Sequence, residues 1–403
     1  MRFPSYSSEW HSYTLGEILT FYSTNSFSRE KLNYDTGSVK NIHYGDIHTK
    51  FPSIVSVSDN KDIPFINNEI DLSKYSENQY LQNGDLIIAD ASEDYEDIGK
   101  AIEVKNIDDE KVLAGLHTIL ARDNNNITVN GFKAYLFSTN SLKTKIKIIA
   151  NGISVLGISK NSLSKLTVNV PSKNEQNDVV DFISLIDNKI ELLEQKHQYY
   201  LDFKKFLMQQ IFAQKLRFDD NCQYKTKQVK DFLIESKIEG IDDINKRLTV
   251  KLNLKGITVR ESKTIEIEGA TKQFIRKTGQ FIYGKQNLHK GAFGIIPKEL
   301  DGYLTSSDIP SFDFKGGIKP KWFYYYFARK SFYEKLENLS TGTGSKRISP
   351  KEFLNIKIIV PEFKEQHKIV CLLEKFDEKI NGISNQIVQM NMFKKSLLQQ
   401  MFV

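Results

Sequence analysis

Few residues in this 403-residue sequence have the types and spacing that chemistry requires. The only Gly-Lys dipeptides, Gly99-Lys100 and Gly284-Lys285, are followed by Ala and Gln instead of Ser or Thr, so neither is a P-loop. His43 and His48, in NIHYGDIHTK, could be metal ligands, but no third or fourth ligand lies near them in the sequence. No adjacent Pro-Pro pair occurs, which excludes the usual Asn/Asp-Pro-Pro-aromatic motif of amino-methyltransferases. The chain is therefore expected to be non-catalytic and to hold no metal.

A glycine-containing loop, TGTGSKR at residues 341–347, is the best candidate for binding a phosphate group. Successive main-chain N–H groups in such a loop can hold an anion, although the same composition also suits a flexible turn. Lys346 and Arg347 follow the glycines directly and favour the phosphate interpretation. The two cysteines, Cys222 and Cys371, form no CxxC pair and favour free thiols in a reducing compartment such as the cytoplasm.

Two long segments of the chain repeat each other. Residues 170–212 align without a gap with residues 360–402, at a constant offset of 190. The identities run along the whole match, from Val-Pro and Glu-Gln at its start to a block of Phe-Lys-Lys, Leu, Gln-Gln and Phe at its end. Such a repeat predicts one structural unit used twice, each copy consisting of a globular segment followed by a helix.

Both repeated segments carry apolar residues at alternating four- and three-residue spacing. This spacing is typical of a helix that packs along a partner helix, so we expect the two to pair as an antiparallel coiled coil. Lysine occupies the same apolar position in both copies, at Lys204 and Lys394, and there it either extends to solvent or sets the register. Ser172 and Glu175 predict a capping box at the first helix, which would run for about 55 Å to Phe212.

The globular segments are expected to mix helices and strands, and their charges differ. Residues 1–170 hold 17 Lys+Arg against 21 Asp+Glu, whereas residues 213–360 hold 28 against 17. Within the first segment, the lysines between Lys133 and Lys165 have no acidic residue among them. A polyanion could bind such a face, although two ordinary solvated faces fit the charges equally well. Strands are predicted around VKNIHYGDIHTKF and DLIIAD, and one aromatic helix is predicted over residues 320–340.

The order of these features resembles the DNA-specificity subunit of type I restriction-modification systems. The resemblance rests on G…IS…L…VP…EQ…I followed by a long helix, present twice, and on KGAFGIIPKELDGYLTSSDIPSF at residues 290–312. It implies an α+β chain with a pseudo-twofold internal repeat. The predicted domains are a target-recognition domain at 1–170, a conserved helix at 171–213, a second recognition domain at 214–360 and a C-terminal helix at 361–403.

The resemblance also implies the partners. Each recognition domain would read half of a split sequence in double-stranded DNA, and the helices would dock two methyltransferase subunits, with restriction subunits in the full complex. S-adenosylmethionine, ATP and Mg²⁺ would bind those partners and not this chain, and no membrane contact is expected. The alternatives are a nuclease built on two similar halves and a coiled-coil adaptor without a DNA role.

Candidate site residues follow from charge, polarity and repetition. Cations and hydrogen-bonding side chains in both globular segments are the predicted DNA contacts: Lys40, His43, Tyr44, His48, Lys50, Lys143, Lys145, Lys147, Lys251, Arg260, Lys285, Gln286, Thr343, Ser345, Lys346 and Arg347. The repeated polar pairs are the predicted partner-docking contacts: Glu175, Gln176, Lys204, Lys205, Glu365, Gln366, Lys394 and Lys395.

Overall fold

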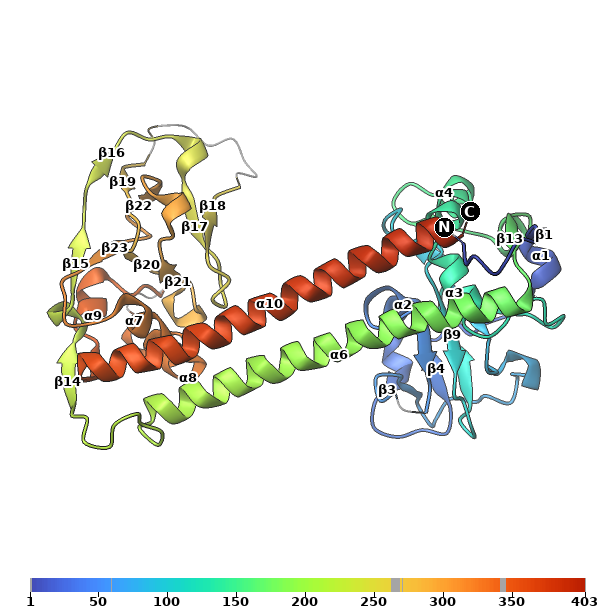
Figure 1. Cartoon of the computed structure of the whole chain (residues 1–403), viewed down its shortest axis with the longest axis horizontal. Coiled ribbons are helices and arrows are strands. Elements are labelled where there is room, and N and C mark those ends of the chain that lie inside the picture. The colour runs from blue at the N-terminus through green and yellow to red at the C-terminus, as the bar shows by residue number, and fades with distance from the viewer. Residues whose placement is uncertain (1, 59, 262–268, 270, 341–345, 403) are drawn as a thin grey trace. The chain divides into compact units, whose positions relative to one another are not determined.

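The computed structural model describes residues 2–58, 60–261, 269, 271–340 and 346–402. The chain forms two compact units (Figure 1). Unit 1 consists of Met1–Leu193 and Gln386–Val403, and unit 2 of Glu194–Asn385. Each unit thus contains one globular segment together with a part of each long helix.

Unit 1 is built on two sheets. Their strand orders are β2-β11-β7-β9-β5 and β10-β4-β6-β3, and the pairs β5–β9 and β10–β4 are parallel while the others are antiparallel. Two further antiparallel pairs are β1–β13 and β12–β8. The strands are β1 His11–Thr14, β2 Thr20–Tyr22, β3 Leu32–Asn33, β4 Lys40–Ile42, β5 Ile54–Ser56, β6 Phe65–Ile66, β7 Leu86–Ala89, β8 Ala91–Ser92, β9 Ala101–Lys105, β10 Val112–Ala114, β11 Thr118–Arg122, β12 Leu156–Gly157 and β13 Thr167–Val170. The helices of its globular segment are α1 Leu15–Ile18, α2 Tyr44–Thr49, α3 Phe132–Phe137, α4 Asn140–Ile149 and α5 Lys160–Ser164, with 3-10 helices η1 Arg29–Lys31 and η2 Glu77–Gln79.

Strand β7 divides the core of unit 1 into two layers. Its sequence LIIA is buried throughout because both faces of the sheet are covered. Leu86 and Ile88 point into the cluster formed with α3, α4 and the long helices, whereas Ile87 and Ala89 point into a second cluster beneath α2. Helix α3 approaches the long helix closely at Gly131, which has φ +91° and where a Cβ atom would lie 2.9 Å from Val180.

The described residues of unit 2 form four small sheets. Their strand orders are β15-β23-β20-β21, β16-β19-β22, β17-β18 and β14-β24, and all of their pairings are antiparallel. The strands are β14 Tyr224–Gln228, β15 Leu233–Ser236, β16 Glu239–Gly240, β17 Leu248–Val250, β18 Ile257–Val259, β19 Gln273–Ile275, β20 Phe281–Tyr283, β21 Phe293–Ile295, β22 Leu304–Ser306, β23 Ser311–Phe314 and β24 Lys357–Pro361. The helices are α7 Pro320–Phe327, α8 Lys330–Tyr333 and α9 Pro350–Leu354, with 3-10 helices η3 Val229–Asp231, η4 Ile244–Lys246, η5 Leu288–Lys290, η6 Lys298–Leu300 and η7 Glu334–Leu339.

The aromatic segment 320–340 of unit 2 is not one helix as predicted. It divides into α7, α8 and η7, with Arg329 in an extended conformation between the first two. This break turns Phe332 back onto Tyr326 and Phe327, with ring centroids 4.9 and 5.1 Å apart. Burial of the aromatic side chains therefore outweighs the propensity to continue the helix.

The strand predicted through His43 is also wrong beyond Ile42. The chain instead turns into α2, where the His43 imidazole caps the helix by accepting the main-chain N–H of Gly45 at 3.1 Å. The first N–H groups of a helix have no partner within the helix, so a side chain that accepts one of them stabilises the helix start.

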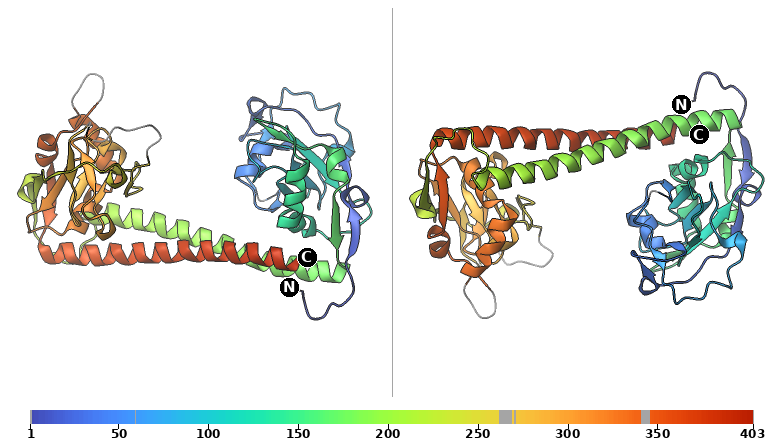
Figure 2. Two further views of the ribbon diagram at one scale, coloured as in Figure 1. Left: turned by 90° about the horizontal axis from the view of Figure 1, so that it is seen from above. Right: turned by 90° about the horizontal axis from the view of Figure 1, so that it is seen from below.

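The long helices are α6, Lys173–Phe212, and α10, Phe363–Met401. Within unit 1, the start of α6 and the end of α10 pack side by side (Figure 2). The contacts there join Asp187 to Lys394 and bring Leu193 near Gln386, so the two segments run antiparallel in this unit. The predicted apolar positions are buried in this cluster: Val179, Ile183, Ile186, Ile190, Leu397 and Met401.

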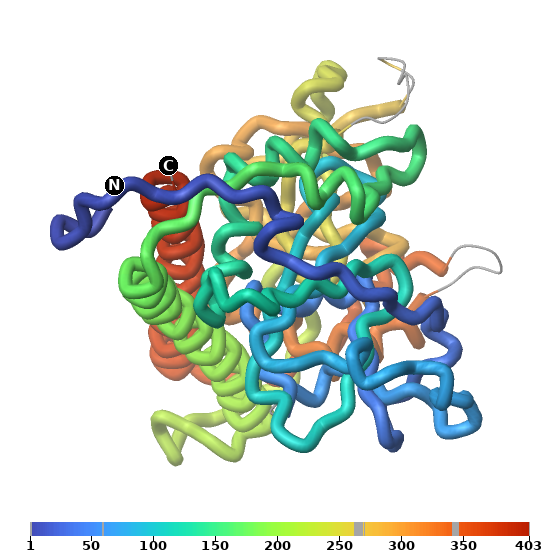
Figure 3. Tube along the Cα trace, turned by 90° about the vertical axis from the view of Figure 1, so that its right-hand side faces the viewer, coloured from blue at the N-terminus to red at the C-terminus, as the bar shows by residue number. Residues whose placement is uncertain are grey.

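The predicted capping box of α6 is only half formed. The Ser172 hydroxyl accepts the main-chain N–H of Glu175 at 3.4 Å, but the Glu175 carboxylate turns away to Arg2. The N-terminal segment that carries Arg2 runs beside the end of α10 (Figure 3), where the rings of Trp10 and Phe402 meet edge to face. No helix among the described residues is long and apolar enough to span a membrane.

Candidate nucleic-acid interface

Six cations of unit 2 lie on three segments that main-chain hydrogen bonds join. The β17–β18 hairpin is tied to η5 because the main-chain N–H groups of Asn253 and Leu254 donate to Lys290 and Gly291, each at 2.9 Å. The loop after β20 is tied to the segment before α9 because Ile348 N–H donates to the Lys285 carbonyl at 2.9 Å. These bonds place the basic residues of this surface on neighbouring loops: Lys251, Lys255, Lys285, Lys290, Lys346 and Arg347.

Two of these cations form exposed ion pairs. Lys346 Nζ lies 2.8 Å from Glu337 Oε1, and Arg347 Nη1 lies 3.1 Å from Asp308 Oδ1. Exposed pairs of this kind contribute about 0–1 kcal/mol, so Lys346 can exchange its carboxylate partner for a phosphate at little cost. Four of the predicted DNA contacts are exposed: Lys251, Gln286, Lys346 and Arg347. Lys285 is half-buried.

The remaining unit 2 predictions have different outcomes. Arg260 is exposed at the end of the hairpin, and its main-chain N–H donates to the Arg247 carbonyl at 2.7 Å. Thr343 and Ser345 lie outside the described residues, so the predicted phosphate contacts of the glycine loop stay predictions.

Two predicted DNA contacts of unit 1 are buried, and their assignment to the surface is wrong. Lys40 lies in β4, where its ammonium group pairs with Glu110 Oε1 at 2.8 Å. His43 is the buried cap of α2, and desolvation, assisted by the nearby Arg29 guanidinium, lowers the pKa of its imidazole to about 4. The neutral ring is therefore a structural group that stabilises the start of α2.

Tyr44, His48 and Lys50 lie on α2 with less burial. Tyr44 and His48 pack edge to face with ring centroids 5.7 Å apart, and a His48 ring nitrogen lies 3.1 Å from the Ala91 carbonyl oxygen. Lys50 is exposed and donates to the Tyr34 hydroxyl at 2.7 Å while pairing with Asp46. Only Lys50 of these three presents its polar group at an exposed position.

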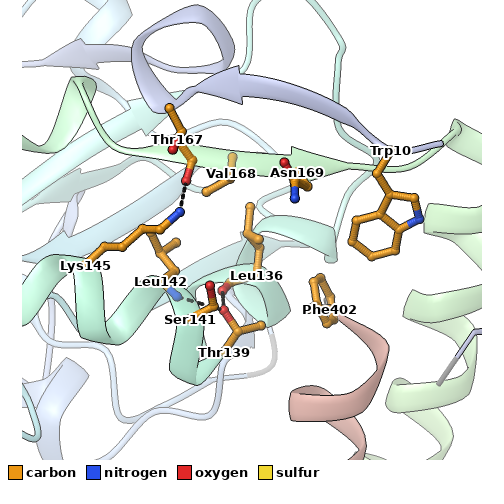
Figure 4. A pocket seen from close by; sticks show the side chains of 10 residues that line it. All are labelled: Trp10, Leu136, Thr139, Ser141, Leu142, Lys145, Thr167, Val168, Asn169 and Phe402. Carbon is orange, nitrogen blue, oxygen red and sulfur yellow. Dashed lines mark hydrogen bonds between the residues drawn. The ribbon is translucent and has the colours of Figure 1, made fainter.

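The lysines of α4 have no acidic neighbour in the sequence, but the fold brings one close to them. Lys147 pairs with Glu96 Oε1 at 2.6 Å, because the loop after β8 folds back against α4. Lys145 donates to the Thr167 carbonyl at 2.7 Å, beside a cavity of about 50 Å³ (Figure 4). Burial lowers the pKa of the Lys143 ammonium group, which is half-buried. A cavity of this volume has room for a few water molecules at most and is too small for a cofactor.

The repeated Glu-Gln pairs are buried, so their predicted place on an exposed docking face is wrong. In unit 1, the Gln176 amide oxygen accepts from Val129 N–H at 2.8 Å, and its nitrogen donates to the carbonyls of Ile127 and Pro171. In unit 2, Gln366 makes the same three contacts with the residues 190 positions later: Lys319, Gly317 and Pro361. Each glutamine therefore joins its long helix to the globular segment.

The glutamates beside them are held by different groups in the two units. Glu175 binds Arg2 through two hydrogen bonds of 2.6 Å and accepts from the Trp10 indole at 3.2 Å. Glu365 accepts the main-chain N–H of Phe218 at 2.8 Å. The N-terminal segment and the loop after α6 thus perform the same role in the two halves.

The two repeated lysines belong to a second duplicated contact, which we call the Tyr-Asp-Lys cluster. In unit 1 the Asp187 carboxylate accepts from the Tyr135 hydroxyl at 3.0 Å and pairs with Lys394 at 2.5 Å. In unit 2, Asp377 accepts from Tyr325 at 2.6 Å and pairs with Lys204. Each lysine also lies over the tyrosine ring of its cluster, at 5.5 Å in unit 1 and 5.0 Å in unit 2.

The tyrosines and aspartates of these clusters were not predicted as site residues. Their signal was present, because each pair of equivalents differs by the same offset of 190. Burial, together with the hydrogen-bonded carboxylate, raises the pKa of both tyrosine hydroxyls. The tyrosines therefore stay protonated and act as donors to the aspartates. Lys205 and Lys395, by contrast, are exposed and retain their predicted availability to a partner.

Comparison with known proteins identifies the family. Residues 7–199 and 224–389 match the family model described as the type I restriction modification DNA specificity domain. The MjaVIII type I restriction enzyme specificity subunit of Methanocaldococcus jannaschii is 34% identical over 142 residues, covering 34% of this chain and 32% of that protein. The MjaIX specificity subunit of the same organism is 21% identical over 316 residues, covering 71% of each chain. The chain thus spans about a third of the first relative's length.

Two solved structures share the fold. The type I restriction-modification S subunit from M. genitalium covers 100% of this chain and 99% of its own, with a TM-score of 0.57 and 12% identity. A chain from a structure of type I system assembly and conformational transition covers 97% of both, with a TM-score of 0.56 and 12% identity. Because the family model covers both halves and each half contains the same helix-to-domain contacts, the chain belongs to the type I restriction-modification DNA specificity family.

Proposed function

We propose that this chain is the non-catalytic specificity subunit of a type I system, in which each unit reads one half of a bipartite DNA sequence. The observation that carries the proposal is the duplication of structure within one chain of this family. Both units contain the same Tyr-Asp-Lys cluster and the same glutamine contacts, at an offset of 190 residues. Two recognition domains built on one plan suit a target with two half-sites.

We further propose that α6 and α10 form an antiparallel coiled coil with a pseudo-twofold relation between the halves. The two ion pairs, Asp187–Lys394 and Lys204–Asp377, support this proposal. Asp187 is the repeat equivalent of Asp377, and Lys204 is the equivalent of Lys394, so each pair is the counterpart of the other. Antiparallel packing is observed within unit 1, and the buried residues Ile369, Leu373 and Ile211 provide the corresponding packing in unit 2. A helix pair of this kind would set the number of base pairs between the half-sites.

Binding to duplex DNA tests the proposal directly. The protein, with its methyltransferase subunits, should bind one bipartite sequence far more tightly than unrelated duplexes, as measured by fluorescence anisotropy. Family membership does not favour a two-half nuclease or a coiled-coil adaptor without a DNA role. Failure to prefer any sequence would contradict the proposal and leave the adaptor alternative.

Lys346→Ala should weaken binding to all sequences alike. Its ammonium group is exposed, and among the described residues its ion-pair partner is an exposed carboxylate, so we assign it to a DNA phosphate. Loss of one phosphate contact lowers the slope of log affinity against log salt concentration by about 0.9. Titrations at several salt concentrations measure this slope, and Lys225→Ala, which changes an exposed lysine of β14, is the matched control. An unchanged slope would remove Lys346 from the DNA surface.

The proposed protein partners are two methyltransferase subunits, joined by restriction subunits in the full complex. The exposed helix faces share Phe203 and Lys205 with their equivalents Phe393 and Lys395. They differ at other positions, because exposed Tyr199 and Phe206 of α6 correspond to Gln389 and Ser396 of α10. We propose that S-adenosylmethionine, ATP and Mg²⁺ bind the partners, and that the complex acts in the cytoplasm on double-stranded DNA.

The stoichiometry of the methyltransferase should be two catalytic subunits to one copy of this chain. Both copies of the helix face present a phenylalanine and a lysine at equivalent positions, which supports two sites. Native mass spectrometry of the complex at saturating partner measures the ratio. A stable one-to-one complex would show that the differences between the faces outweigh their shared residues.

A further inference from the structure

Three segments of unit 2 meet where main-chain hydrogen bonds join them. Lys285 N–H donates to the Asp308 carbonyl at 2.9 Å, and Ile348 N–H donates to the Lys285 carbonyl at 2.9 Å. The loop after β20, the loop between β22 and β23 and the segment before α9 are thereby joined through their main chains. Asp308 and Arg347, from two of these segments, have fixed backbone positions.

A buried arginine anchors the loop that carries Asp308. Arg276 is 1% exposed and donates to Thr305 Oγ1 at 2.5 Å, to Ser311 Oγ at 2.8 Å and to the Ile309 carbonyl at 3.1 Å. Within the described part of the chain, it forms no ion pair with a carboxylate. Burial lowers its pKa to about 10, so it is charged at neutral pH and bound only to neutral acceptors. Because these acceptors lie on both sides of Asp308, the guanidinium holds this loop in one conformation.

One N–H group of the Arg347 guanidinium binds a carboxylate, and its other N–H groups are available to a ligand. Its Nη1 group binds Asp308 Oδ1 at 3.1 Å, and the two side chains are 48% and 52% exposed. A guanidinium has five N–H donors, so one bond to a carboxylate leaves a fork that can bind two acceptors. Guanine presents its O6 and N7 acceptors in the major groove with the spacing that such a fork fits.

The neighbouring Lys346 provides a contrast. Its carboxylate partner, Glu337, belongs to η7, and a single ammonium charge on a flexible stem suits a phosphate better than a base edge. The 190-residue equivalent of Arg347 in the first half is Gly157, which has no side chain to read a base.

We propose that Arg347 reads a guanine in the half-site bound by unit 2, with its guanidinium oriented by Asp308. This inference rests on the proposed function, because it names the base-reading group of one recognition domain. Asp308 is a positioning residue, and Arg276 fixes the loop from which Asp308 acts. Since the first half has Gly157 at the equivalent position, discrimination by this contact is confined to one half-site.

The test compares the sites methylated by the assembled methyltransferase containing the unchanged chain, Arg347→Lys, Asp308→Asn or Lys346→Ala. Sequencing of methylated sites in a random duplex library gives the base preference at each position. Arg347→Lys keeps the charge but loses the fork, so preference for one G·C pair in one half-site should fall about tenfold or more. Asp308→Asn should relax the same position, whereas Lys346→Ala should lower the yield at all sites without changing the base preferences.

The outcomes separate this inference from the proposed function. If the unchanged complex shows no bipartite target, the proposed function fails. If the unchanged complex has a target and Arg347→Lys leaves every base preference as it was, the inference fails alone. Relaxation in both half-sites would equally overturn it. Because the Arg347 and Asp308 side chains are 48% and 52% exposed, these variants should fold, and circular dichroism verifies this.

Discussion

Inserting the same four helix-forming residues after Gln195 and after Asn385 should lengthen the preferred spacer of the DNA target by one or two base pairs. Four residues add about 6 Å and about 40° of rotation to a helix. B-DNA rises about 3.4 Å per base pair, which yields the expected change. Both half-site sequences should stay the same because neither recognition domain is altered. Sequencing of methylated sites measures spacer and half-sites together.

The structure explains why both helices must be lengthened. Gln195 lies between Asp187 and Lys204 of α6, and Asn385 lies between their partners Asp377 and Lys394 of α10. A paired insertion preserves both ion pairs, whereas an insertion in α6 alone moves one pair out of register. The single insertion is the matched control and should abolish site-specific methylation. An unchanged spacer with altered half-sites in the paired variant would show that the helices do not set the spacing.

Gln176→Ala and Gln366→Ala should each destabilise their own unit by about 2–4 kcal/mol. Each change leaves one main-chain N–H and two carbonyl groups without the buried amide, and an unsatisfied buried group costs about 1–3 kcal/mol. Water that enters the vacated space recovers part of this loss. The two losses should be similar, because the two sets of contacts are the same.

The two tryptophans allow each unit to be followed separately in urea. Trp10 lies in unit 1 and Trp322 in unit 2, so Trp322→Phe and Trp10→Phe backgrounds report on one unit each. Gln176→Ala should shift only the Trp10 transition, and Gln366→Ala only the Trp322 transition. Lys205→Ala, an exposed change on α6, should shift neither by more than about 0.5 kcal/mol. If both Gln176→Ala and Gln366→Ala lowered the free energy of unfolding by less than about 1 kcal/mol, the glutamine contacts would not be structural.

Periodicity alone was enough to predict the long helices and much of their buried face. Repetition at a constant offset indicated that the chain consists of two related halves. Two unrelated segments would not share identities along 43 aligned positions without a gap. The same repetition marks Lys204 and Lys394, and their ionic partners Asp377 and Asp187 are also identical at the 190-residue offset. What the repeat could not specify was that each aspartate also binds a tyrosine of the globular segment.

The predictions that failed depended on contacts between residues far apart in the chain. Lys40 and the Glu-Gln pairs look like surface groups in sequence. In the fold, however, Lys40 pairs with Glu110, Glu175 with Arg2, and Glu365 with the Phe218 N–H, while both glutamines bond to the main chain. The lysines of α4 have no acidic neighbour in sequence, but Glu96 reaches Lys147 across the fold.

The sequence by itself determined the repeated architecture and the heptad seam, because both are periodic properties that local spacing encodes. Only the tertiary structure decided which polar groups are structural and which remain available to DNA or a partner. The physical reason is that burial of a charge or an amide depends on whether a distant group satisfies it, and that group is brought near only by folding. Arg347 remains exposed with most of its donors available, whereas Gln176, equally polar in sequence, is fully occupied inside unit 1.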